Sequence, residues 1–72
     1  MLKKNVVEHF GGYPKVASIC GISRQAVHVW TDVLKRGTED RLLAGMVLRA
    51  YSDGDDLETT VKEFLELKNK EV

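Results

Sequence analysis

The fold is decided by residues 13–30, which read YPKVASICGISRQAVHVW. Pro14 suits the first turn of a helix, because the N–H that proline lacks would be unpaired there anyway. Ala17 is small enough for a second helix to cross at its position, and Gly21 supplies a turn conformation that a Cβ would resist. Ser23 follows two residues later and is a good N-cap for that second helix. Residues 13–30 therefore predict two short helices joined by a three-residue turn.

The second of these helices is expected to run from about Ser23 to Val33. Ile22, Val27 and Trp30 would bury its inner face, since Val27 and Trp30 lie three residues apart on one side of a helix. Its opposite face and its N-terminal end then project into solvent. An exposed helix of this kind fits the major groove of DNA, which is about 12 Å wide.

The rest of the chain also has helical periodicity. Apolar residues predict a first helix over residues 2–10, which the glycine pair that follows would end. Thr38 can cap a long helix whose apolar stripe extends to Tyr51, and a last helix would begin near Asp55 or Asp56. The apolar side of that last helix would be formed by Leu57, Val61, Phe64 and Leu65. The pattern predicts an all-α protein, a small bundle of four to five helices with a helix-turn-helix.

The alternative is an α+β fold with a C-terminal hairpin. Asp53-Gly54 is a common hairpin turn, and residues 48–51 could pair with residues 57–61 around it. The apolar stripes on both sides of this turn have helical rather than alternating spacing, so helices are favoured.

Length and charge limit what the chain can be. Its 72 residues suffice for a single domain, residues 1–72. The net charge is zero, but residues 1–36 contain six basic and two acidic residues, whereas residues 37–72 contain five basic and nine acidic ones. The basic half could face phosphate while the acidic half faces solvent or a partner. Residues 38–72 would complete the core or form a dimer contact.

Several classes of protein are not supported by the sequence. No apolar run approaches the roughly 20 residues of a membrane span, and no signal peptide is recognised. Cys20 is the one cysteine, which fits a reducing cytoplasm and predicts a small buried side chain. His9 and His28 have no carboxylate or thiol at ligand spacing, so no metal site is expected. Without a nucleophile–base pair or a phosphate loop, neither an enzyme nor a cofactor or small-molecule ligand is predicted.

A family resemblance joins these observations. The run from Val16 to Trp30 resembles the helix-turn-helix of phage Cro-type repressors, and residues 3–11, KKNVVEHFG, resemble the first helix of the all-helical branch of that family. Together the two segments place the resemblance over residues 2–33. It implies a transcriptional repressor that acts in the cytoplasm of a bacterial host cell. It also implies binding of a near-palindromic operator in double-stranded DNA as a homodimer.

The resemblance also implies which residues meet DNA. Arg24 and Gln25 match the positions that reach base edges, and Val29 matches a third position that faces the groove. Arginine can bond guanine and glutamine can bond adenine through two hydrogen bonds each, and valine can contact the thymine methyl group. His28 and Ala26 lie beside these residues, and Tyr13 matches a position that clamps the DNA backbone. The remaining candidates for phosphate contact are Ser23, Lys15, Lys35 and Arg36.

Two further expectations concern the competing function and the first residues of the chain. A helical protein-interaction module without DNA contact, such as an anti-repressor or assembly factor, is the alternative function. This alternative would be favoured if the outer face of the helix after Ser23 were apolar rather than basic and amide-bearing.

Lys3 and Lys4 could meet phosphate but are expected to be solvated, because chain termini are usually loosely ordered.

Overall fold

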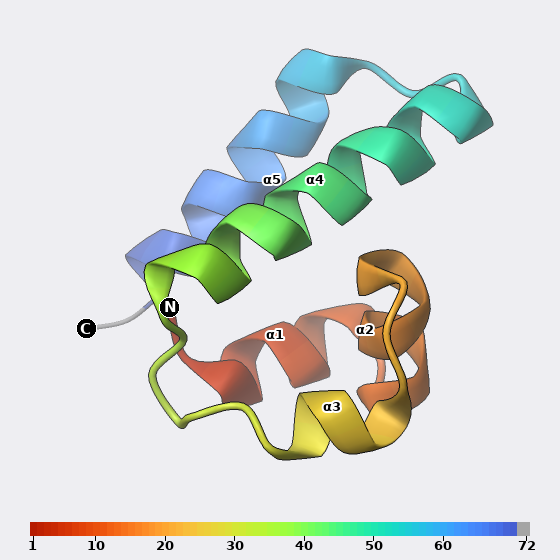
Figure 1. The fold of residues 1–72 in the computed structure, drawn as a ribbon. Helices are drawn as coiled ribbons and strands as arrows, with labels where there is room; N and C mark the ends of the chain where they lie inside the picture. The colour runs from red at the N-terminus through yellow and green to blue at the C-terminus, as the bar shows by residue number, and fades with distance from the viewer. Residues whose placement is uncertain (71–72) are drawn as a thin grey trace.

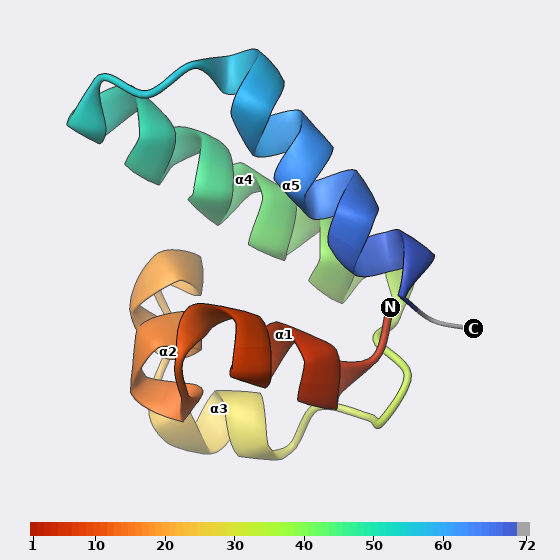
Figure 2. The same cartoon turned by 180° about the vertical axis from the view of Figure 1, so that it is seen from behind.

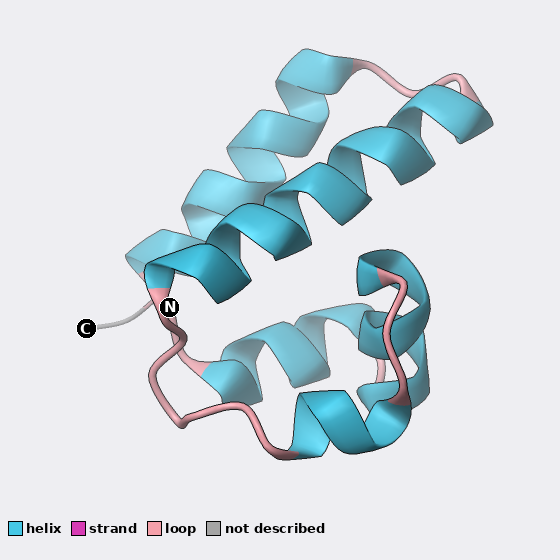
Figure 3. Cartoon of the chain, viewed as in Figure 1, coloured by secondary structure: helices cyan, strands magenta, loops and turns pink. Residues whose placement is uncertain are grey.

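The computed structural model describes residues 1–70, and these form five helices (Figure 1). The helices are α1 (Lys3–Phe10), α2 (Tyr13–Cys20), α3 (Arg24–His28), α4 (Arg36–Asp53) and α5 (Leu57–Asn69). Among the described residues there is no strand, only an isolated bridge between Leu2 and Val33 (Figure 3). The prediction of an all-α bundle is confirmed.

The alternative hairpin around Asp53-Gly54 is wrong. Gly54 has a φ of 74° and ends α4, and the next backbone N–H, that of Asp55, donates to the Ala50 carbonyl at 2.8 Å. Asp56 then caps α5, since its side chain accepts a hydrogen bond from the Glu58 N–H at 3.1 Å. The Asp-Gly pair therefore belongs to a link between two helices. The helical spacing of the apolar residues on both sides was the stronger signal.

The helices form two layers. The two opposite views show α1, α2 and α3 together on one side and the antiparallel pair α4 and α5 on the other (Figures 1 and 2). The layers meet closely where α2 crosses α4. A Cβ added to Gly45 of α4 would collide with the carbonyl oxygen of Ile19 and lie 2.9 Å from its carbonyl carbon. Gly45, which costs a helix about 1 kcal/mol relative to alanine, is therefore required by this crossing.

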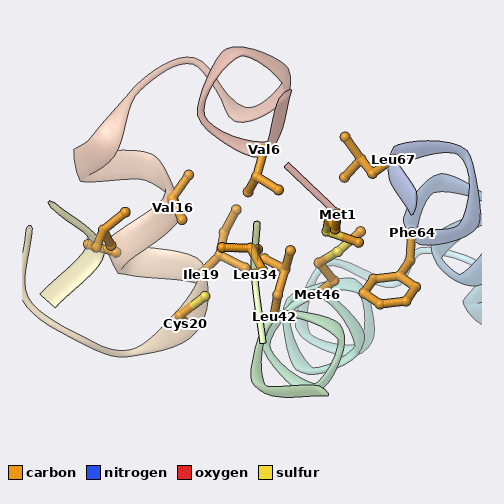
Figure 4. Close-up of a cluster of buried hydrophobic side chains, with 12 residues drawn as sticks. Met1, Val6, Val16, Ile19, Cys20, Leu34, Leu42, Met46, Phe64 and Leu67 are labelled. Atoms are coloured by element: carbon orange, nitrogen blue, oxygen red, sulfur yellow. The ribbon is translucent and has the colours of Figure 1, made fainter. Parts of the chain in front are cut away.

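The hydrophobic core lies between the two layers (Figure 4). Its least exposed large side chains are Met1, Leu42, Leu67, Val6, Val16 and Val27. Cys20 is buried in the same cluster, as the sequence predicted, and Trp30 packs against it while remaining partly exposed. None of the helices over residues 1–70 is long and apolar enough to cross a membrane.

The start of α4 differs from the prediction. Thr38 does not cap it: the helix begins at Arg36, and its N-cap residue, Lys35, makes no side-chain capping bond. Glu39 lies in the first turn of the helix. Its carboxylate is drawn inside, where it accepts hydrogen bonds from the Met1 ammonium at 3.1 Å and from Lys68 Nζ at 3.2 Å. These contacts connect the first residues of the chain, α4 and α5.

The rotation of α5 about its axis also differs. Phe64 is buried as predicted, but its buried companions are Thr60 and Leu67. The other members of the predicted apolar side, Leu57, Val61 and Leu65, are 41–49% exposed. Of the two roles expected for residues 38–72, completing the core is thus met by Phe64, whereas these three side chains are left at the surface.

Candidate nucleic-acid interface

The turn between α2 and α3 is built by local hydrogen bonds. Gly21 ends α2 with a φ of 67°, and the Ile22 N–H donates to the Ala17 carbonyl at 3.0 Å. Ser23 then starts α3 in extended conformation, and its hydroxyl oxygen accepts a hydrogen bond from the Ala26 N–H at 3.2 Å. The three-residue turn and the start of the second helix are thus placed as the sequence predicted.

The second helix is shorter than predicted. α3 ends at His28 rather than near Val33, because the residues beyond it bond elsewhere. The Trp30 N–H bends back to the Val27 carbonyl at 3.1 Å, and the Asp32 carbonyl accepts the backbone N–H of Lys3 at 2.9 Å. The segment after α3 therefore follows the start of the chain instead of continuing the helix.

The outward face of α3 presents polar side chains to solvent. Arg24 and Gln25, in its first turn, are exposed, whereas Val27 on the opposite side is fully buried. Val29, directly after the helix, is 79% exposed. Ala26 is only half-buried, so it lies between the outer and inner faces. Arg24, Gln25 and Val29 are thus available to a partner, as predicted.

His28 and Tyr13 are brought together from α3 and α2. Their rings stack at a centroid distance of 3.9 Å with an angle of 7° between the planes. His28 is exposed and Tyr13 is half-buried, so the stack lies at the edge of the outward face. The Lys3 ammonium lies 5.7 Å from the centre of the Tyr13 ring, in the range of a cation–π contact.

The basic candidates lie in different places. Lys35 and Arg36 are exposed at the start of α4, at the end of the segment that follows α3. Lys15 instead lines a groove between α2 and α4 with Leu48 and Arg49, so it is not gathered with the residues of α3.

The segment from Arg24 to Arg36 has a predominantly positive charge. Asp32 is the one acidic residue between positions 24 and 36. Within residues 1–70, the side chains of Arg24, Lys35 and Arg36 have no carboxylate partner within ion-pair distance. Three guanidinium or ammonium groups are therefore left to bind an anion from outside the chain.

Lys3 is the residue of this region that sequence reasoning misjudged. Its ammonium donates to the backbone carbonyls of His28 at 2.9 Å and Trp30 at 3.4 Å, so it is not a solvated end of the chain. The bonded residues are 25 and 27 positions apart in the sequence, and no local pattern indicates such a contact.

Two other groups bear on the chemistry. Burial raises the pKa of the Cys20 thiol, although the charge of Arg41 lowers it in part, so the reactive thiolate is disfavoured. No group of three or more potential metal-ligating side chains occurs in the described part of the chain.

The chain was compared with protein-family models, with curated proteins and with solved structures. It matches none of them.

Proposed function

We propose that this protein is a sequence-specific DNA-binding transcriptional repressor that places α3 in the major groove. The observation that carries the proposal is the outward face of α3. It combines an unpaired Arg24 and an exposed Gln25 at the N-terminal end of the second helix of a helix-turn-helix. In proteins of this geometry, residues at that end of the second helix contact base edges.

The side chains suit particular bases. Arg24 can donate two hydrogen bonds to O6 and N7 of guanine, and Gln25 can pair with N6 and N7 of adenine. Val29, with its side chain largely exposed, can contact a thymine methyl group. Each bidentate contact contributes about 1–3 kcal/mol of discrimination against a wrong base.

Other residues would hold the backbone of the duplex. Lys35 and Arg36 can bind phosphate on the side where α3 ends, and the Tyr13 hydroxyl can do so beside His28. Ser23 has its hydroxyl engaged in capping α3, which leaves its O–H proton available to a phosphate oxygen. Lys15 is the weakest of these candidates because it faces the groove toward α4.

The proposal includes a homodimer on a near-palindromic operator. Two half-sites on one face of DNA lie about 34 Å apart. The protein measures 31 × 28 × 21 Å, so each half-site can accommodate one copy. The segments after Gly37 would supply the contact between the two copies. The family resemblance adds that the bound dimer would repress transcription by blocking a promoter in a bacterial cytoplasm.

A second candidate, a protein-interaction module, is favoured by a different observation. The pair α4 and α5 exposes five large apolar side chains: Leu48, Tyr51, Leu57, Val61 and Leu65. Large apolar side chains left exposed on a small protein can serve contacts with another protein. They belong to α4 and α5, the layer that does not contain α3 (Figures 1 and 2), so they are compatible with a dimer as well as with another partner.

Binding to labelled duplexes across a salt series tests the proposal. Phage and host promoter fragments are compared with a random duplex by fluorescence anisotropy. We expect affinity to fall steeply with salt and one fragment to bind about a thousandfold more tightly than random DNA. Arg24→Ala should reduce that preference, whereas Arg49→Ala, an exposed arginine on α4, should not. No binding to any duplex at low salt would reject the proposal and favour the interaction module.

A further inference from the structure

A helix as short as α3 has little intrinsic stability. It spans five residues, and its last carbonyl groups have no partners within a continuing helix. The Gln25 carbonyl accepts the Val29 N–H at 3.2 Å, and the Val27 carbonyl accepts the Trp30 N–H at 3.1 Å. The carbonyls of His28 and Trp30 are instead met by the ammonium of Lys3, at 2.9 and 3.4 Å. A positive charge at this end also compensates the negative pole of the helix.

Lys3 is itself held in place by backbone bonds. Its N–H donates to the Asp32 carbonyl at 2.9 Å, and the Leu34 N–H donates to the Met1 carbonyl at 2.8 Å. The bridge between Leu2 and Val33 lies between these two bonds. The start of α1 and the segment after α3 are therefore joined along their backbones, and the Lys3 side chain extends this junction to the end of α3.

An aromatic stack connects the same end of α3 to α2. The Tyr13 and His28 rings lie 3.9 Å apart and nearly parallel, and the Lys3 ammonium is 5.7 Å from the Tyr13 ring centre. Three residues from three helices thus meet at one place. We call Lys3, Tyr13 and His28 the α3 clamp.

We propose that Lys3 is a positioning residue for α3, which acts through the α3 clamp to fix the helix that presents Arg24 and Gln25. The consequence for sequence preference rests on the function proposed above. An ammonium bonded to two carbonyls is engaged within the protein. Lys3 therefore contributes to selective binding through the orientation of α3, and His28 serves the stack rather than base contact.

Hydrogen exchange of the free protein tests the clamp without DNA. Lys3→Met removes the ammonium and keeps an unbranched side chain, and Lys4→Met removes the same charge from the exposed neighbouring residue. We expect the backbone amides of residues 27–30 to exchange at least about tenfold faster in Lys3→Met, because a hydrogen bond to a charged group is lost. Lys4→Met should match the unsubstituted protein. Equal exchange in the two variants would overturn the proposal.

A second variant covers the case in which Lys3→Met does not fold. His28→Ala removes only an exposed ring and the stack, so it leaves the core untouched. Faster exchange at residues 27–30 in His28→Ala is then the expected result, and unchanged exchange there would reject the α3 clamp.

DNA binding separates positioning from phosphate contact. Both lysine variants lose one charge, so their affinities for random DNA should fall equally. Only Lys3→Met should lose a further factor of about ten on the preferred site, corresponding to the same lost hydrogen bond. Lys3→Arg, which can still donate to both carbonyls, should restore the preference. Equal specific losses in Lys3→Met and Lys4→Met would show that Lys3 does not position α3. If the unsubstituted protein binds no DNA, the proposed function fails, and hydrogen exchange alone decides the role of Lys3.

Discussion

Gly45 of α4 should not tolerate even the smallest side chain. Gly45→Ala gains about 1 kcal/mol of helix propensity. Against this gain, the added Cβ meets the carbonyl of Ile19, which is backbone and cannot rotate away as a flexible side chain would. Overpacking of this kind costs about 1–3 kcal/mol, and contact with a fixed backbone places the cost at or above the upper end. We expect a net destabilisation of about 2 kcal/mol.

Thermal unfolding followed by circular dichroism measures this loss. For a domain of this size, 1 kcal/mol corresponds to about 4–8 °C, so the midpoint should fall by about 8–16 °C. Gly37→Ala is the matched control, because Gly37 lies in the same helix and a Cβ there would have no neighbour within 4 Å. It should stabilise the protein by up to about 1 kcal/mol. A Gly45→Ala protein as stable as the Gly37→Ala protein would refute the close crossing of α2 and α4.

Three further predictions concern the cap of α3, the pairing of Glu39 and the exposed face of α5. Ser23→Ala should cost about 1 kcal/mol in chemical unfolding through the loss of the cap bond to Ala26, and a midpoint equal to that of the unsubstituted protein would contradict that role. Burial acts to raise the pKa of the Glu39 carboxyl, but hydrogen bonds and charge from the Met1 ammonium and Lys68 outweigh it and hold the pKa below its ordinary value. The stability from this pairing is present at neutral pH and is lost as pH falls below about 4.3. Glu39→Gln should therefore be less stable than the unsubstituted protein at pH 7 and equally stable near pH 3. A difference in stability that persists at pH 3 would count against this role of Glu39. Val61→Glu should leave the monomer folded but weaken self-association in sedimentation equilibrium, and unchanged association would exclude this face from the dimer contact.

The sequence predicted those parts of the fold that depend on local pattern. Apolar spacing located the helices, and Gly21 and Ser23 marked the turn between α2 and α3, since each acts on the backbone beside it. The exposure of Arg24 and Gln25 followed from the burial of Val27 on the opposite face.

The errors all involve contacts between distant segments. α3 stops at His28, and the segment from Asp32 to Leu34 bonds to the start of the chain. Glu39, in the first turn of α4, pairs with Met1, 38 residues away. The buried side of α5 includes the polar residue Thr60, so it does not coincide with the apolar stripe that contains Leu57. Single-sequence periodicity contains no information about such pairings, and the role of Lys3 was missed for the same reason.

The central claim is that α3 selects a base sequence through Arg24. Selection of bound duplexes from a random library, carried out in parallel with the unsubstituted protein and with Arg24→Ala, tests it most directly. The account predicts enrichment of a near-palindromic site with half-sites about 10 base pairs apart, and loss of preference at one guanine in each half-site when Arg24 is removed. Failure to enrich any sequence, or enrichment of the same guanine by both proteins, would contradict it.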